Sequence, residues 1–387
     1  MLSGLTVIEQ GGFVAVPYCA RLLADLGARV IKIEPPEGDI ARRHGPYPPG
    51  KAGMESSGLF AFLNSGKESV VLDSQDAEAR SFLACAARRA DVWISDRPWH
   101  ALRDIGADEE TLRALNPRLV YCAHSTFGRT GPYSDRAGGS LHAAALSGVA
   151  WAIGVPGRSP LSLPLAQTDF QAGVHGAAAI LAALLCRRRS GVGQFIDIAM
   201  ADILAAYAGI GATLFINYGL PWRREGRRAA GSMGPYPCGI FPCKDGLVVL
   251  IARTPRDWDQ FLKAVGSPAW GDNPRYRDQI AMGHDYPDEV DALVIGELAR
   301  YTQTELFAMA RKWEFPCAPV RQVGDTLDDA HFAARGFFIE QDLPGIGRVK
   351  LPRLPFRYSL TPQRAFALPP SLGQHTAAVR EELGASQ

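Results

Sequence analysis

The stretch LTVIEQGGFVAVPYCARLLADLGARVIKIE, residues 5–34, decides the fold class. Residues 5–9 read as a short buried strand, and residues 29–34 read as another strand. Between them, residues 17–26 carry apolar side chains at helical spacing, and Gly27 follows where a glycine commonly ends a helix. A strand, a short helix and a strand within about 30 residues predict a right-handed βαβ unit with parallel strands.

The same alternation of strand and helix patterns continues along the first half of the chain. The strand-like runs are residues 69–72, 92–95, 117–123 and 195–198, and the helical segments are residues 77–89, 170–189 and 202–214. Repeated βαβ units predict an α/β fold with a doubly wound, Rossmann-like parallel sheet. In such a sheet the ligand lies at the carboxyl ends of the strands.

Length and a change in composition predict a second domain. The chain has 387 residues, whereas a single hydrophobic core rarely serves more than about 250–300 residues. From about residue 218, Gly, Pro and Arg are frequent, and residues 239–251 read as a hairpin around Lys244-Asp245-Gly246. We expect a large domain over residues 1–204, a linker over 205–230, a small α+β domain over 231–313, a linker over 314–330, and a C-terminal part over 331–387 that returns to the large domain.

Composition excludes several classes of protein. The 41 Lys and Arg residues balance 40 Asp and Glu residues, so no bulk charge favours nucleic acid or an anionic membrane. Seven scattered cysteines do not suggest a disulfide framework, and the Cys238/Cys243 pair lacks the further ligands of a zinc site. The N-terminal residues lack the basic region of a signal peptide, and the longest apolar runs fall short of the ~18 residues that span a bilayer. We therefore expect a cytoplasmic protein without a metal ion.

Three common active-site motifs are incomplete. The first turn, residues 10–15, lacks the spaced glycines of a dinucleotide-binding loop. Residues 64–68 lack the upstream glycine and the Ser or Thr of a phosphate-binding P-loop. Ser140, in residues 138–142, lacks the second glycine of a nucleophile elbow. The sequence therefore does not favour a nicotinamide enzyme, a P-loop NTPase or a serine hydrolase.

Carboxylates at the expected ends of strands and helices remain as candidate catalytic residues. Asp169 is expected just before the long helical segment, where backbone N–H groups and the positive helix end favour the ionised form. A carboxylate in that position is either a simple helix cap or an ionised nucleophile for acyl transfer. Asp197 and Asp202 occupy equivalent positions at a strand end and a helix start. Spacing alone does not choose among the three.

The order of several short motifs is more specific than any one of them. They are LADLGARVIKIEP (23–35), LNSGK (63–67), FGRTGPY (127–133), GVGQFIDIAM (191–200), GIFPCKDG (239–246) and FPCAPV (315–320). In these motifs the chain resembles the class III coenzyme A transferases, the family of formyl-CoA and carnitine-CoA transferases, over nearly its whole length.

The resemblance implies a mechanism and an assembly. It makes Asp169 the nucleophile that attacks an acyl-CoA, giving a mixed anhydride and then an aspartyl-CoA thioester. Coenzyme A and a carboxylic acid are then substrates, and no prosthetic group is needed. A glycine-containing loop, Gly231-Ser232-Met233-Gly234, matches a lid that would shield the anhydride from water and offer N–H groups to the oxyanion. The family also implies a homodimer with interlocked chains.

The resemblance further implies a set of residues that bind coenzyme A. They are Phe13 and Ala15 in the first turn, Asn64 and Lys67 before the third strand, and Asp96, Arg97 and Arg103 around an Arg-Pro-x4-Arg stretch. Arginine forks suit phosphate oxygens, although solvated surface cations would give the same pattern. Pro35 stands where many members have an arginine, so one adenine or phosphate contact is either lost or replaced by Arg42 or Arg43.

Two departures from the family pattern concern the reaction. Ser95-Asp96 stands where the family commonly reads Glu-Asn-Phe, and Gly139-Ser140 replaces a Tyr-Asp or His-Asp pair. A glycine cannot move a proton, which disfavours a related acyl-CoA racemase that would use Asp169 as a base. His142 lies close enough in sequence to leave that alternative open. A third hypothesis is a non-catalytic protein that binds CoA esters.

Overall fold

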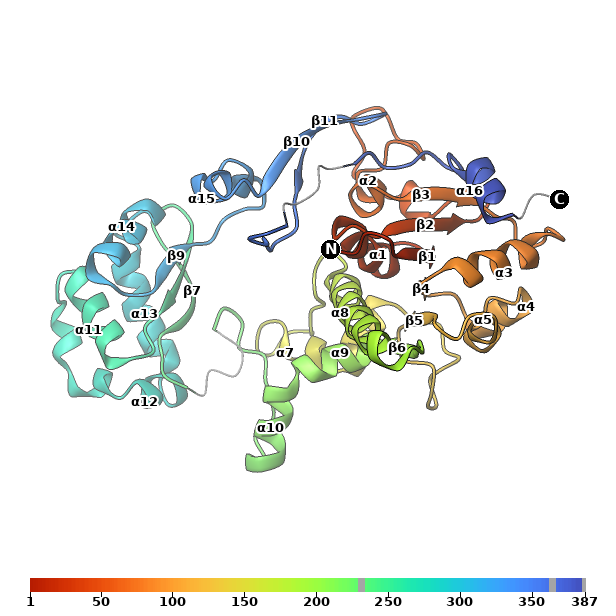
Figure 1. The fold of residues 1–387 in the computed structure, drawn as a ribbon. Helices are drawn as coiled ribbons and strands as arrows, with labels where there is room; N and C mark the ends of the chain where they lie inside the picture. The colour runs from red at the N-terminus through yellow and green to blue at the C-terminus, as the bar shows by residue number, and fades with distance from the viewer. Residues whose placement is uncertain (229–233, 362–366, 385–387) are drawn as a thin grey trace. The chain divides into compact units, whose positions relative to one another are not determined.

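The computed structural model describes residues 1–228, 234–361 and 367–384 of the chain (Figure 1). It divides the chain into two compact units. The first comprises Met1–Ser147, Leu163–Ala206 and Asp329–Gln387, and the second comprises Gly148–Ser162 and Tyr207–Asp328. Residues 148–162, which the sequence-based boundaries placed in the large domain, belong to the second unit.

A six-stranded parallel sheet forms the centre of the first unit. Its strands are β1 (Thr6–Gln10), β2 (Arg29–Glu34), β3 (Glu68–Val71), β4 (Val92–Ser95), β5 (Val120–Ser125) and β6 (Phe195–Ala199). Their order is β3-β2-β1-β4-β5-β6, and every neighbouring pair is parallel. This confirms the predicted doubly wound α/β sheet. The strand order reverses between β1 and β4, and ligands bind outside the carboxyl ends of the strands at such a switch point.

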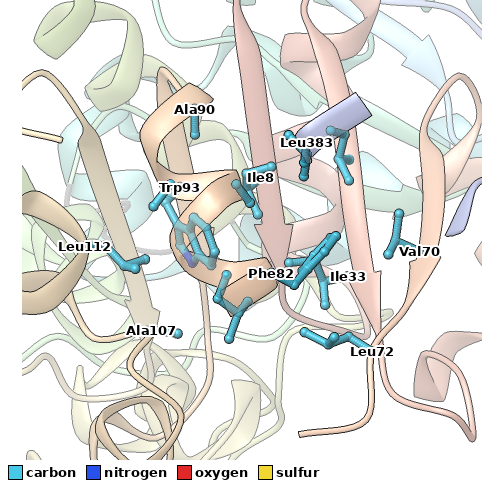
Figure 2. Packing of buried hydrophobic residues seen from close by; sticks show 14 of the residues in the cluster. Ile8, Ile33, Val70, Leu72, Phe82, Ala90, Trp93, Ala107, Leu112 and Leu383 are labelled. Atoms are coloured by element: carbon cyan, nitrogen blue, oxygen red, sulfur yellow. The ribbon is translucent and has the colours of Figure 1, made fainter. Parts of the chain in front are cut away.

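Helices cover both faces of this sheet (Figure 1). On one face α3 (Ala79–Arg89), α5 (Glu109–Leu115) and α16 (Thr376–Leu383) pack over the apolar side chains of the strands. Figure 2 shows this core, in which Phe82 of α3 and Leu383 of α16 lie near Trp93 of β4 and Ile8 of β1. The helix α16 thus brings the C-terminal segment back onto the first unit.

The other face carries α1 (Ala15–Asp25) and α8 (Gln167–Ser190). These two helices pack closely because α8 has a glycine where they meet. A Cβ atom at Gly173 would lie 2.9 Å from the carbonyl oxygen of Ala15 and 3.1 Å from the backbone nitrogen of Cys19. By length and composition α8 could span a membrane, which the sequence did not predict. Its inner face, including Ala172 and Ile180, is buried, so α8 serves as a core helix of the first unit.

Gly173→Ala is expected to destabilise the protein by about 1–3 kcal/mol, because the added methyl group meets backbone atoms that cannot rotate away. Chemical denaturation measures the free energy of unfolding. Gly296→Ala is the matched control, since a Cβ atom there meets nothing within 4 Å. Gly296 lies inside a helix, so its replacement should raise stability by about 0.5–1 kcal/mol. Equal effects of the two substitutions would contradict the close approach of α1 and α8.

The second unit is a small antiparallel sheet with helices. Strands β7 (Cys238–Pro242) and β8 (Leu247–Ile251) form the predicted hairpin, and β9 (Cys317–Pro319) pairs with β8. Its helices are α7 (Val149–Ala152), α10 (Gly209–Tyr218), α11 (Pro255–Ala264), α12 (Gln279–His284), α13 (Pro287–Leu298) and α14 (Gln303–Trp313). The core of this unit holds Trp258, Phe261 and Leu306. The single helix predicted over residues 202–214 is instead two helices, α9 (Met200–Tyr207) and α10.

The remaining elements of the first unit are short. They are α2 (Gly58–Asn64), α4 (Trp99–Asp104), α6 (Ser140–Leu146), α15 (Ala330–Ala334), β10 (Phe338–Leu343) and β11 (Gly347–Pro352). Strands β10 and β11 form an antiparallel pair, and Leu343 and Leu351 from them pack with Ala61 of α2. Of the elements in this group, α6 matters most for the site, because its first residue faces Asp169.

Candidate active site

Asp169 lies in the first turn of α8. The helix begins at Gln167, two residues before Asp169, whereas the sequence predicted a start after it. Leu165 and Ala166, directly before the helix, have positive φ angles of 51° and 54°. Such angles are uncommon outside glycine and cluster at functional sites. The side chain of Asp169 is buried, with 7% of the residue exposed.

A cavity of about 550 Å³ in the first unit contains Asp169. Its wall is built at the carboxyl ends of β4 and β5, from the first turn after β1, and from the starts of α6 and α8. Ser140 and Gly139 line it next to Asp169, and His124 and Met200 also contribute. This is the place where a doubly wound sheet binds its ligand.

The position of the other two candidate carboxylates separates them from Asp169. Asp197 lies within β6, is exposed, and accepts a hydrogen bond from the backbone N–H of Arg129 at 2.8 Å. Asp202 is exposed in the first turn of α9. Of these three aspartates, all in the described part of the chain, Asp169 alone lines the cavity.

The environment of Asp169 shifts its pKa upward. Burial raises the pKa of the carboxyl, and hydrogen bonds from the Ser140 hydroxyl and from its own backbone N–H oppose the shift. The direction is opposite to the one expected for a carboxylate at a helix start, because desolvation outweighs the helix end. A partly desolvated carboxylate is more basic and thus a better nucleophile toward a carbonyl carbon.

Four of the residues predicted to bind coenzyme A meet at this cavity. Phe13, Ala15, Asp96 and Arg97 all line it. The first turn is held by carboxylates: the N–H of Gly12 donates to Asp96 at 3.1 Å, and that of Phe13 donates to Asp39 at 3.0 Å. Glycine at position 11 allows this close approach, because a Cβ atom there would lie 3.0 Å from Asp96 and 2.6 Å from Val16.

A second hollow of about 440 Å³ adjoins the cavity. Gly12, Phe13, Asp96 and Arg97 line both, so the two spaces share one wall. Arg43 lines the second hollow together with Pro35, and its guanidinium donates a hydrogen bond to the carbonyl of Glu37 at 2.9 Å. The two hollows together suit a long ligand with one end near Asp169.

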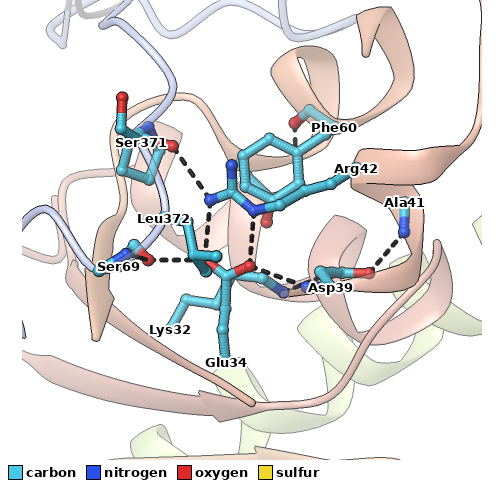
Figure 3. A network of polar contacts seen from close by, with 12 residues as sticks. Lys32, Glu34, Asp39, Ala41, Arg42, Phe60, Ser69, Ser371 and Leu372 are labelled. Carbon is cyan, nitrogen blue, oxygen red and sulfur yellow. Dashed lines mark hydrogen bonds and ion pairs between the residues drawn. The ribbon is translucent and has the colours of Figure 1, made fainter. Parts of the chain in front are cut away.

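Three other predicted ligand residues are buried instead, and Figure 3 shows one of them, Arg42, beside Glu34. Arg42 is fully buried, forms two hydrogen bonds of 2.8 and 2.9 Å with Glu34, and stacks over the ring of Phe60. Lys67 donates to Asn64 at 2.8 Å, and burial lowers the pKa of Lys67 to about 8. Within the described residues, Arg42, Asn64 and Lys67 line neither hollow. These three side chains are buried and form hydrogen bonds with other groups of the first unit.

Arg103, another predicted residue, lies at a different hollow of the first unit. Arg103 lies over the ring of Trp99 and lines a separate hollow of about 210 Å³ with Tyr121 and Phe195. Gly231 and Ser232 lie outside the described residues, and Gly234 belongs to the second unit. Across the described ranges, no group of three or more His, Cys, Asp and Glu side chains could hold a metal ion.

Sequence reasoning missed several residues of the cavity. Arg129, Arg136 and His100 line it, so its wall holds further arginines besides Arg97, together with the carboxyl groups of Asp96, Asp135 and Asp169. Arg129 lies in one of the quoted motifs, whereas no local pattern marks Arg136. His142, which kept the racemase alternative open, is exposed on α6 and is not part of the cavity lining in the described chain.

His124 is a second histidine in the wall of the cavity, besides His100. It lies on β5 with none of its surface exposed, and neither ring nitrogen has a hydrogen-bond partner among the described residues. The ring fits against α8 at Gly176, where a Cβ atom would lie 2.5 Å from Nε2. Burial lowers the pKa of His124 to about 4. The imidazole is therefore neutral at physiological pH.

His124→Leu is expected to reduce the fall in the free energy of unfolding that occurs as the pH is lowered. The unfolded chain takes up a proton on this ring below about pH 6.5, whereas the folded chain does so only near pH 4. Wild-type stability should therefore fall by roughly 3 kcal/mol across that range, and the variant should lack this part of the fall. Denaturation at several pH values measures it. His142→Leu, at an exposed histidine, should retain the wild-type slope; the same slope in all three proteins would refute the assignment.

Comparisons with known proteins fit this geometry. The model of CoA-transferase family III matches residues 2–376. The chain is 32% identical to succinate–glutarate CoA-transferase from Agrobacterium fabrum, covering 99% of this chain and 95% of that protein. It is 33% identical to the alpha subunit of succinyl-CoA–L-malate CoA-transferase from Chloroflexus aurantiacus, covering 99% and 88%. The crystal structure of a CaiB/BaiF family protein from Brucella suis superposes with a TM-score of 0.88 at 30% identity, over 99% of each chain.

Proposed function

Because the chain belongs to CoA-transferase family III and is an enzyme that transfers CoA, we propose that it moves CoA between an acyl-CoA thioester and a carboxylic acid, with Asp169 as the nucleophile. One observation carries the proposal. Of the three aspartates that spacing alone could not rank, Asp169 is the one that lines the cavity, in a part of the chain that the structure describes. Its carboxylate is largely buried, and the hydrogen bond from Ser140 offsets part of the cost of that burial. Because it also lines the cavity, it can attack the carbonyl carbon of a bound thioester.

The proposed reaction is a sequence of acyl exchanges on Asp169. One carboxylate oxygen attacks the thioester carbonyl, the CoA thiolate leaves, and a mixed anhydride forms. The thiolate then attacks the aspartyl carbonyl, which releases the first acid and leaves an aspartyl-CoA thioester. The second acid attacks this thioester and forms a new anhydride, from which the thiolate takes the acyl group. Asp169 is restored, and no water is consumed.

The two adjoining hollows support a place for coenzyme A. We assign the thioester end to the cavity with Asp169 and the nucleotide end to the hollow that Arg43 lines. The pantetheine arm would pass Phe13 and Ala15, and the exposed Arg97 and Arg136 would meet phosphate oxygens. The loop with Gly231, Ser232 and Gly234 remains the proposed lid. Coenzyme A is a substrate in this scheme, and no prosthetic group takes part.

Short dicarboxylic acids are the proposed donor and acceptor. The names of the two CoA-transferase relatives include succinate, glutarate and malate, all of which carry two carboxylates. The cavity here lies beside Arg129 and Arg136, whose charges would attract a second carboxylate. A Cβ atom at Gly139 would meet nothing within 4 Å, which leaves room beside Asp169 for the body of such an acid.

A homodimer with interlocked chains and a cytoplasmic location complete the proposal. The first unit is built from three separate segments of the chain, so the chain leaves it and returns, as an interlocked ring requires. The outer face of α8 supports an interface, because Val174 and Leu185 are exposed on it. Light scattering at micromolar concentration tests the dimer.

Trapping experiments test the chemistry. The protein is incubated with a panel of acyl-CoAs and treated with hydroxylamine, and its peptides are analysed by mass. Modification of the peptide with Asp169 supports the proposal, whereas modification at Asp197 or Asp202 overturns it. A panel of mono- and dicarboxylic acids of equal chain length then tests the substrate class, and equal rates for both would exclude a dicarboxylate preference.

The two alternatives make different predictions. A racemase would exchange the α-hydrogen of an acyl-CoA with deuterated solvent in the absence of any acceptor acid. The structure offers it little support, since position 139 is glycine and His142 is exposed. A non-catalytic CoA-ester-binding protein would bind acyl-CoA but would show no turnover with any acid.

A further inference from the structure

Ser140 makes a contact with Asp169 that the proposed reaction steps do not use. Ser140 is the first residue of α6, and its hydroxyl donates a hydrogen bond to Oδ2 of Asp169. The two residues are 29 positions apart in the sequence, and both line the cavity. Gly139, at the N-cap of α6, makes no side-chain cap, and the hydroxyl of Ser140 bonds to Asp169 rather than to the helix backbone.

This bond makes the two oxygens of Asp169 different. Oδ2 accepts the hydrogen bond of Ser140, so the attack on the thioester carbonyl falls to Oδ1. Once Oδ1 has bonded to the acyl group, Oδ2 is the carbonyl oxygen of the aspartyl anhydride. The Ser140 hydroxyl then faces an oxygen that will carry negative charge in the next step.

We propose that Ser140 is a catalytic residue: its hydroxyl stabilises the oxyanion that forms on Oδ2 whenever the aspartyl carbonyl is attacked. The inference rests on the proposed function of Asp169. When the CoA thiolate attacks the aspartyl carbon, the carbonyl electron pair moves onto Oδ2. The intermediate collapses as the bond between the aspartyl carbon and Oδ1 breaks, and the released acid keeps Oδ1. When the second acid attacks the aspartyl-CoA thioester, charge forms on Oδ2 again and the thiolate leaves.

The same hydroxyl has no such role in the first attack. There the negative charge develops on the oxygen of the substrate carbonyl, not on Asp169. Ser140 therefore acts on the steps at the aspartyl carbonyl, and its removal should slow those steps more than formation of the first anhydride. A single oxyanion donor contributes roughly 10²–10³-fold in rate.

Ser140→Ala tests the inference in the full-length enzyme. We expect kcat to fall roughly 10²-fold, with KM for acyl-CoA changed less than about threefold, because the hydroxyl acts in the transition state. The aspartyl-CoA thioester, formed by incubation with succinyl-CoA and freed of unbound ligand, should decay more slowly in the variant when glutarate is added. The acid limb of the pH–rate profile should move to higher pH, because the Ser140 bond lowers the pKa of Asp169.

Two further variants and a separate failure mode complete the test. Ser140→Thr keeps a hydroxyl and should recover most of the rate. Ser147→Ala, at the C-cap of the same helix and outside the cavity lining as the structure describes it, should retain wild-type rates. Thioester decay and a pH profile equal to wild type in Ser140→Ala would overturn the role of Ser140. No thioester on Asp169 in the wild-type enzyme would instead overturn the proposed function itself.

Discussion

Asp169→Asn is expected to reduce kcat by at least roughly 10⁴-fold, since losing the nucleophile of a covalent mechanism removes its intermediates altogether. The amide is uncharged and cannot attack a thioester. It is nearly isosteric, however, and its oxygen can still accept the hydrogen bond of Ser140. The fold and the affinity for acyl-CoA should therefore persist, as measured by the thermal midpoint and by calorimetric titration with a CoA ester.

Two variants guard this result against simple artefacts. Asp169→Ala excludes recovery of activity through deamidation of the asparagine. Asp202→Asn changes an exposed aspartate outside the cavity lining of the described structure, and it should retain wild-type turnover. Substantial CoA transfer by Asp169→Ala, together with loss of transfer in Asp202→Asn, would show that the nucleophile is Asp202 on α9 and not Asp169 on α8.

Lys32→Met is expected to cost about 3–5 kcal/mol of stability, the usual effect of breaking a buried ion pair by removing one partner. The ammonium of Lys32 lies 2.7 Å from Oε1 of Glu9 and 2.7 Å from Oδ2 of Asp39, and all three side chains are buried. Figure 3 shows Lys32 beneath the Glu34 and Arg42 pair of the same network. Without the ammonium, two buried carboxylates face an apolar side chain.

The pH dependence of this loss follows from the pKa of Asp39. Burial alone would raise that pKa, but the pairing with Lys32 lowers it below its ordinary value. The pairing therefore stabilises the folded state above about pH 4, the ordinary pKa of an aspartate, and this contribution is lost as pH falls through the folded pKa. The difference between wild type and Lys32→Met should be largest near neutral pH and should shrink in acid.

Matched measurements separate this effect from the loss of any lysine. Lys51→Met removes an exposed lysine of the same unit and should change the free energy of unfolding by less than about 0.5 kcal/mol. Because Asp39 also holds the N–H of Phe13 in the first turn, Lys32→Met should raise KM for acyl-CoA. A change in stability below about 1 kcal/mol would show that the two carboxylates do not depend on Lys32 for their burial.

Local patterns were enough to predict the elements of the sheet. The predicted strand over residues 29–34 coincides with β2, and the one over 92–95 coincides with β4. Both faces of a parallel strand are buried, so β-branched residues such as Val30, Ile31 and Ile33 mark the strand itself. Boundaries near residue 169 were less accurate, since α8 starts after two residues with positive φ, which no sequence pattern marks.

Lys67 and Asn64 show a property of side chains that local reasoning does not reveal. The family resemblance implied ligand contacts for both residues. The structure shows each of them buried, with the ammonium of Lys67 2.7 Å from Glu9, a residue far earlier in the chain. Arg42 likewise pairs with Glu34 and also donates to the carbonyl of Pro370 near the C-terminal end. The sequence around a charged residue beside a strand is the same whether its side chain is solvated or forms a buried ion pair with a carboxylate far away in the chain.

The sequence by itself determined that this chain forms a doubly wound parallel sheet and that it resembles class III coenzyme A transferases, because strand and helix periods and motif order are local or linear properties. Only the tertiary structure decided that Asp169 lines the cavity, that Ser140 donates to it, and that His124 lies there unpartnered among the described residues. The physical reason is that burial and hydrogen-bond partners come from residues far apart in the chain. Those residues meet only when β5, α6 and α8 converge at one end of the sheet.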